Sequence, residues 1–202
     1  MEGGLNFVHE AQGLGELGAL AFHASDGLIR PAMQIRETVA NEAEAAHRTI
    51  LRPLTPADAG EAAKLIRTAF AAQGRLTNPP SSALRETAES VAAKIAEGGG
   101  FGVFEAGALI ASALWSLHGA ALHVARVSVA PEARGRGIVR SLIAACETEA
   151  SRRSVRRMTL KTRLELPENE RLFGRFGFAR REVEAHPGFE APTTAVMEKV
   201  LG

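Results

Sequence analysis

This chain of 202 residues contains one cysteine, one tryptophan and no tyrosine. The single cysteine excludes an internal disulfide and any metal site built from several cysteines, and we expect no bound metal. Aromatic residues make up only 5% of the chain. No stacking platform for nucleic-acid bases is therefore visible, and we expect no nucleic-acid partner. No uninterrupted apolar run approaches the ~18 residues that would cross a bilayer.

The N-terminus also lacks the order of a signal peptide, in which basic residues precede an apolar stretch. We therefore expect a cytoplasmic protein without a membrane anchor. Hydrophobic residues make up 46% of the chain, which permits a sizeable core.

The net charge of +1 conceals an uneven distribution of charge. Residues 123–181 contain fourteen Lys or Arg but only six Asp or Glu, whereas the rest of the chain is acidic. Two interpretations fit this segment: an anion-binding surface, or a solvated basic face without a ligand.

The most informative stretch covers residues 127–140, where an alternating strand pattern stops at a proline and a glycine-containing turn leads into a helix. Ile138, Leu142 and Cys146 recur every four residues, which predicts one apolar helical face. On that face Cys146 is interpreted as a core residue and not as a nucleophile. The first amides of a helix lack intrahelical acceptors and lie at the positive end of the helix dipole. The amides of residues 135–139 are therefore predicted to bind a phosphate group.

The side chains of this turn support the same prediction. Gly135 and Gly137 permit close approach of a ligand to the backbone, while Arg134, Arg136 and Arg140 add positive charge. The turn is not a P-loop, because no Gly-Lys-Ser/Thr follows, and it lacks the third glycine of a dinucleotide-binding fingerprint. An ordinary surface helix that begins with an Arg/Gly turn is the alternative interpretation.

The rest of the chain predicts an α+β fold. From Thr49 onward the patterns indicate a strand, two helices, three antiparallel strands, a helix, a strand, a helix and two strands. The strand at residues 155–164 follows a helical crossover and is therefore predicted to be parallel to the strand before it. The expected strands are residues 50–54, 101–105, 108–117, 122–129, 155–164, 178–183 and 195–201. The expected helices are residues 55–72, 81–97, 169–176 and one that begins at Ile138.

These elements place one domain at residues 49–202. Residues 1–48 are expected to form an N-terminal extension. Its first 30 residues are interrupted by glycines and are predicted to be poorly ordered, and residues 31–46 have the pattern of a helix with a thin apolar face.

Two motifs resemble signatures of the GNAT family of N-acetyltransferases. Arg134-x-x-Gly137-x-Val139, after a Val-x-Val-x-Pro strand end, resembles the family's acetyl-coenzyme A motif, Arg/Gln-x-x-Gly-x-Gly/Ala. Val139 departs from it, since the family prefers Gly or Ala there. Residues 166–178 resemble a second signature, Asn-x-x-Leu-Tyr-x-x-x-Gly-Phe. The predicted order of elements is also that of the GNAT fold, which has a mixed, mostly antiparallel sheet flanked by helices.

The resemblance implies an enzyme that transfers an acetyl group directly from acetyl-coenzyme A to a primary amine of a small molecule or peptide. It also implies that the backbone groups of Val127 and Val129 contact the pantetheine arm, because the next strand splays away. Asn169 has an alternative interpretation as a helix cap. A homodimer is an open alternative to a monomer. The residues expected to contact the coenzyme are Val127, Val129, Arg134, Gly135, Arg136, Gly137, Ile138, Val139, Arg140, Asn169 and Phe173.

The catalytic groups of the family are less complete in this chain. Phe173 replaces the tyrosine that often protonates the departing thiolate, and no Asp or Glu lies between Glu105 and Glu132 to act as a base. His123 is the candidate base, because an unperturbed histidine has a pKa of about 6.5. A purely structural role for this strand histidine is the alternative. A catalytically inactive protein that binds or senses acyl-coenzyme A is the alternative to an enzyme.

Overall fold

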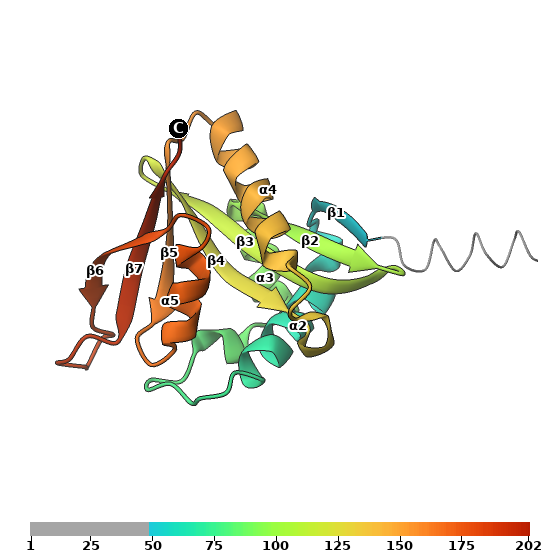
Figure 1. The fold of residues 1–202 in the computed structure, drawn as a ribbon. Coiled ribbons are helices and arrows are strands. Elements are labelled where there is room, and N and C mark those ends of the chain that lie inside the picture. Colours follow the sequence, from blue (N-terminus) through green and yellow to red (C-terminus); the bar gives the residue numbers. More distant parts are fainter. Residues whose placement is uncertain (1–48) are drawn as a thin grey trace, which may run out of the picture. The chain divides into compact units, whose positions relative to one another are not determined.

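The structure, a computed structural model, describes residues 49–202 (Figure 1). The predictions for residues 1–48, including the helix at residues 31–46, lie outside the described residues. No helix in the described part is long and apolar enough to cross a membrane. The strands are β1 (Thr49–Pro53), β2 (Gly99–Glu105), β3 (Ala108–His118), β4 (Ala121–Val129), β5 (Arg157–Arg163), β6 (Ala179–Glu184) and β7 (Thr194–Val200). The helices are α2 (Ala59–Ala71), α3 (Ala88–Glu97), α4 (Ile138–Arg152) and α5 (Pro167–Gly174), with short 3-10 turns η1 (Pro56–Asp58), η2 (Ser82–Arg85) and η3 (Pro131–Ala133).

The strands form one seven-stranded sheet in the order β1-β2-β3-β4-β5-β7-β6. Strands β2, β3 and β4 form the predicted antiparallel meander. All neighbouring strands are antiparallel except β4 and β5, which α4 connects and which run parallel, as predicted. The predicted α+β fold with a mixed, mostly antiparallel sheet is therefore confirmed.

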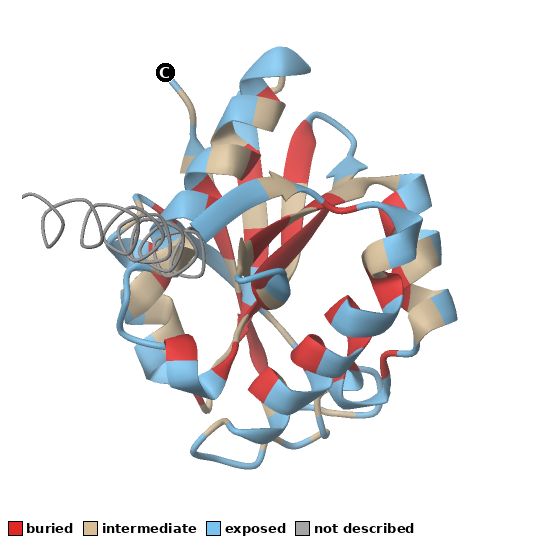
Figure 2. Ribbon diagram, turned by 90° about the vertical axis from the view of Figure 1, so that its right-hand side faces the viewer, coloured by how far each residue is buried: buried red, intermediate tan, exposed pale blue. Residues whose placement is uncertain are grey.

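Helices cover both faces of the sheet (Figures 1 and 2). The spacing of apolar residues in α4 places its buried face against the sheet, as the sequence pattern predicted. Burying such aliphatic side chains contributes about 1.5–3 kcal/mol each. The core on the α4 and α5 side includes Leu122, Val124, Leu142, Cys146, Leu160 and Phe173. The core on the α2 and α3 side includes Leu54, Ala62, Ile66, Val91 and Leu114.

The prediction of one continuous helix over residues 81–97 was wrong. The chain forms η2, leaves helical geometry at Glu86 and Thr87, and starts again as α3. The hydroxyl of Thr87 accepts a hydrogen bond from the Ser90 amide, and the Thr87 amide donates to Ser90 Oγ. This reciprocal cap begins a new helix where the apolar spacing alone predicted continuity. Helix α5 also begins two residues earlier than expected, at Pro167.

The three glycines at residues 98–100 have a role that the sequence prediction missed. Gly98 ends α3 as predicted, but Gly99 and Gly100 belong to β2. A Cβ on Gly99 would lie 2.4 Å from the indole ring of Trp115 on β3. The glycine therefore lets the two strands approach over a large aromatic side chain.

Candidate active site

A cleft of about 680 Å³ opens in the sheet where β4 and β5 part. The two strands pair only from Leu122↔Met158 to Val124↔Leu160, so their later residues diverge. The cleft is bordered by residues 124–129 of β4, residues 160–163 of β5, the turn before α4, α5 and the end of α2. Its volume lies within the range typical of small-molecule sites.

A bulge shapes β4 beside this opening. The pairing of β3 with β4 shifts so that Ala113 faces both Arg126 and Val127. Arg126 has a φ of +52°, in the left-handed region that non-glycine residues seldom adopt. A bulge bends its strand and leaves one residue outside the regular ladder, and bulges are common next to active sites. Val127 and Val129, both predicted to contact a coenzyme, line the cleft.

The turn before α4 presents backbone donors to the same cleft. Gly135 and Gly137 have φ values of +78° and +75°, so the turn uses their conformational freedom. Gly137 precedes the first helical residue, and no side chain caps the helix there. Within residues 49–202, no hydrogen bond is formed by the amides of residues 135–139, whereas the Arg140 amide donates to Gly137 O at 3.0 Å. A helix N-terminus without a side-chain cap attracts anions.

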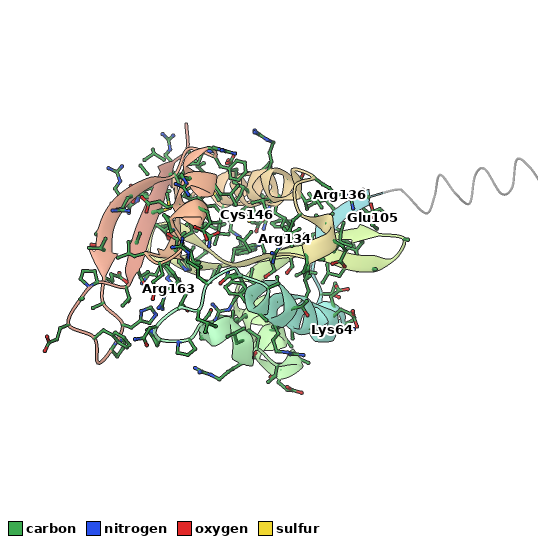
Figure 3. All side chains as sticks on the ribbon, turned by 60° about the horizontal axis from the view of Figure 1, so that its bottom comes forward. Lys64, Glu105, Arg134, Arg136, Cys146 and Arg163 are labelled. Atoms are coloured by element: carbon green, nitrogen blue, oxygen red, sulfur yellow. The ribbon has the colours of Figure 1, made fainter. Side chains whose placement is uncertain are left out.

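The arginines of this turn have different roles. The guanidinium of Arg134 donates to the carbonyl oxygens of Ala69 and Ala72 at 2.9 and 3.1 Å, which ties the turn to the end of α2. Arg136 lies beside Glu105 (Figure 3) and is bonded to it, with one contact of 3.0 Å. Arg136 is not among the residues that line the cleft. The structure therefore separates the Arg136 side chain from the other predicted coenzyme ligands.

Arg140 lies on the cleft side of the turn. Its guanidinium is 5.5 Å from the centre of the Phe176 ring, and both residues line the cleft. Basic side chains outnumber acidic ones along the cleft. Among the described residues that line it, Glu168 is the only acidic one. This imbalance favours an anionic ligand. The basic residues are Arg126, Arg134, Arg140, Lys161, Arg163 and Arg175.

Helix α5 supplies Asn169 and Phe173 to the cleft. Asn169 is the third residue of the helix and does not occupy its cap position, so the alternative interpretation as a cap is wrong. Phe173 packs edge-to-face against Phe178, with ring centres 6.1 Å apart. The phenyl ring has no hydrogen-bond donor, so this position cannot supply the proton of the family's tyrosine.

His123, the predicted base, does not line the cleft. It lies in the paired part of β4, its Nδ1 is 3.1 Å from Thr159 Oγ1, and its ring stacks on His118. Burial lowers the pKa of His123 to about 4, and the positive charges of His118 and Lys161 add to this shift. The structure therefore does not bring His123 together with the other predicted site residues.

Among the cleft residues that the sequence prediction did not name, Arg126 and Thr162 are the most informative. Arg126 is the one charged residue of β4, and its isolation in an apolar strand was the signal that could have singled it out. Thr162 alternates with basic residues in β5 and gave no such signal. The residue is nevertheless buried and is one of those that line the cleft.

Cys146 is part of the α4 core and is fully buried, as predicted. Burial raises the pKa of its thiol to about 12, and the negative charges of Glu147 and Glu149 act in the same direction. Because the thiolate is the nucleophilic form of cysteine, Cys146 is not suited to accept an acyl group.

A family model described as "Acetyltransferase (GNAT) family" matches residues 67–178, which is more than half of the chain. The chain belongs to the GNAT family. It is therefore an acyltransferase of the N-acetyltransferase type, and acetyl-coenzyme A is the co-substrate of this family. No match was found among curated proteins.

Solved GNAT structures share this fold. PaiA N-acetyltransferase from Thermoplasma acidophilum, solved in complex with coenzyme A, is 18% identical with a TM-score of 0.62, and the match covers 76% of this chain and 99% of that one. The ribosomal-protein-S18-alanine N-acetyltransferase of Escherichia coli is 16% identical with a TM-score of 0.61, over 76% of this chain and 94% of that one. At these identities, the similarity establishes the fold alone.

Proposed function

We propose that this GNAT protein transfers the acetyl group of acetyl-coenzyme A to a primary amine without a covalent enzyme intermediate. The observation that carries the proposal is the continuity between the cleft of β4 and β5 and the uncapped turn at residues 135–139. One elongated ligand with an anionic end and a neutral arm fits such a site.

The coenzyme is proposed to bind with its diphosphate at the free amides of the turn. Its pantetheine arm then follows the backbone of Val127 and Val129 between the parted strands, with Asn169 and Phe173 on the α5 side. The thioester comes to the narrow end of the cleft, near Val124 and Leu160, where β4 and β5 meet. This placement follows the direction in which β4 and β5 converge, and the Thermoplasma relative, solved in complex with coenzyme A, supports testing this ligand.

The proposed reaction needs only the two bound substrates. The lone pair of the amine nitrogen attacks the thioester carbon, the carbon–sulfur bond breaks, and its electron pair leaves on sulfur. The nitrogen loses a proton to solvent and the thiolate gains one. The burial of Cys146 agrees with direct transfer, because the chain's only thiol cannot reach the acetyl group.

The acceptor amine is proposed to approach from the α2 side, where Phe70, Gln73, Ser81 and Arg126 border the cleft. A small-molecule amine and a peptide amine are both compatible with this opening. The name of the Escherichia coli relative, a ribosomal-protein-S18-alanine N-acetyltransferase, supports including peptides among the acceptors that are tested.

The test is an acetylation screen in which free thiol released from acetyl-coenzyme A is measured against amino acids, polyamines, aminoglycosides and N-terminal peptides. We expect saturable thiol release with one class and acetylated product of matching mass. Tight coenzyme binding without turnover would support the inactive alternative. A protein that does not bind the coenzyme at millimolar concentration would contradict the proposal.

A further inference from the structure

Thr162 Oγ1 is a buried hydroxyl without a hydrogen-bond partner among residues 49–202. Thr162 is only 6% exposed. Buried polar side-chain atoms nearly always have a partner, so a hydroxyl that lacks one within the protein needs a specific explanation.

The position of Thr162 supplies that explanation. It lies on β5 two residues after Leu160, the last residue that pairs with β4, and it lines the cleft. Side chains alternate along a strand, so Thr162 shares a face with Leu160, on the side of the sheet covered by α4 and α5. Phe173 lines the cleft from that side. Thr162 therefore lies near the end of the cleft where β4 and β5 meet, and the α5 residue there, Phe173, offers no hydrogen-bond donor.

Ser112 provides a comparison within the same sheet. Its Oγ is the other buried side-chain atom without a partner in the described part of the chain, and the residue is fully buried in β3. Ser112 does not line the cleft. A buried hydroxyl without a partner is thus not by itself a sign of a ligand in this sheet. Thr162 differs from Ser112 because the residue that carries the hydroxyl lines the cleft.

We propose that Thr162 Oγ1–H donates a hydrogen bond to the sulfur of coenzyme A, both in the thioester and in the thiolate that leaves. This inference rests on the proposed function, because it needs the coenzyme in the cleft. As the carbon–sulfur bond breaks, its electron pair moves to sulfur and the hydrogen bond from Thr162 stabilises the charge that develops there. Thr162 keeps its proton, because an alcohol is a much weaker acid than a thiol, and the thiolate takes its proton from solvent.

The test is a titration of the thiol of bound coenzyme A, followed by the ultraviolet absorbance of the thiolate. The chain suits this measurement, because it has no tyrosine that would absorb when ionised. Its single cysteine is buried and its pKa is raised to about 12. A hydrogen bond to the thiolate favours ionisation. We expect the bound thiol of the unmodified protein to have an ionisation constant about tenfold larger than that of the Thr162→Val complex, which is one pKa unit.

Three variants separate the hydrogen bond from packing. Thr162→Val keeps the β-branched shape and removes only the hydroxyl, so the ligand-free variant should be at least as stable as the unmodified protein, since no protein partner is lost. Thr162→Ser restores the donor and should restore the ionisation constant. Ser112→Ala removes the comparison hydroxyl and should leave the constant unchanged.

Equal ionisation constants in the unmodified protein and in Thr162→Val would overturn the inference while leaving coenzyme binding intact. If Ser112→Ala lowered the ionisation constant of the bound thiol as much as Thr162→Val does, the inference would also be overturned, since the effect would then come from general loosening of the sheet. If coenzyme A did not bind the unmodified protein, the proposed function would fail, and the inference with it. A fall in kcat for Thr162→Val with an unchanged KM for acetyl-coenzyme A is the matching kinetic result.

Discussion

Arg126 Nε donates a 2.7 Å hydrogen bond to Glu86 Oε1, and this contact ties the bulge of β4 to the segment just before α3. The same guanidinium donates to Ser82 Oγ at 2.9 Å. Lys94 Nζ contacts the other oxygen of Glu86, also at 2.9 Å. Because Glu86 is only 4% exposed, one wall of the cleft is held by a buried ion pair.

We expect Glu86→Gln to destabilise the protein by on the order of 3 kcal/mol at pH 7, because it leaves Arg126 without its charged partner. Burial disfavours the charged form of Glu86, but hydrogen bonds from Lys94, Ser90 and Arg126 outweigh it and lower its pKa to about 2. The unfolded chain, with a glutamate pKa of about 4.3, therefore binds the proton first as the pH falls. The stabilising contribution of Glu86 is present above about pH 5 and is lost between about pH 4.5 and pH 2.

Urea unfolding at pH 7 and pH 3 measures both parts of this prediction. The unmodified protein should lose more stability between the two pH values than Glu86→Gln does. Glu97→Gln, at an exposed position near the end of α3, removes the same charge and is the control. A Glu86→Gln variant as stable as Glu97→Gln at pH 7 would show that the buried pair does not hold this wall.

Arg134→Ala should weaken both the fold and the site. Its guanidinium donates to two carbonyl groups at the end of α2, Ala69 O and Ala72 O, and ties the turn before α4 to that helix. We expect a loss of about 1–3 kcal/mol in unfolding free energy. Arg134→Lys should recover only part of this unfolding free energy, since a lysine ammonium cannot place two planar N–H donors on the two carbonyl oxygens as a guanidinium does. Thermal unfolding with and without acetyl-coenzyme A measures this effect, and an unchanged melting temperature would refute it.

His123→Gln should retain most of the turnover, within about threefold, because His123 lies outside the cleft and contacts Thr159. A pKa of about 4 also means that His123 is neutral over the pH range of the assay, so its titration should not appear in the rate profile above pH 5. The measurement is kcat/KM against pH for both proteins. A hundredfold decrease in kcat/KM for His123→Gln, with a changed dependence on pH at the acidic end of the profile, would support His123 as the base that the sequence suggested.

The sequence predicted the elements around the turn well, because local patterns determine them. The apolar spacing from Ile138 to Cys146 and the crossover into β5 depend on residues close in the chain, and the structure confirms both. The break at Glu86 could not be found in this way. The reciprocal cap of Thr87 and Ser90 makes this break, and apolar spacing does not register it. The neighbouring Glu86 is bonded to Arg126, forty residues later in the chain.

The candidate site shows the same division between local and distant information. The glycines of the turn were found because they act through their own backbone angles. The direction of the Arg136 side chain depends on Glu105, on a strand thirty-one residues earlier. Burial of the Thr162 hydroxyl beside the cleft likewise follows from the packing of separate elements, which periodicity in one strand does not reveal.

The central claim is that backbone amides at the turn hold the coenzyme, and the most direct test compares Gly137→Val with Arg136→Ala. Gly137 has a φ of +75° and lines the cleft, so a valine there strains the turn by about 1–2 kcal/mol and obstructs its amides. Arg136→Ala removes only an exposed ion pair with Glu105. Gly107→Val is the matched control, since Gly107 has a φ of +81° and open space around it but does not line the cleft.

The measurement is calorimetric affinity for acetyl-coenzyme A on variants first shown to be folded. We predict a loss of more than about tenfold for Gly137→Val, where several hydrogen bonds are lost together, and less than about threefold for Arg136→Ala and Gly107→Val. Equal losses for Gly137→Val and Arg136→Ala, or a larger loss for Arg136→Ala, would contradict the claim.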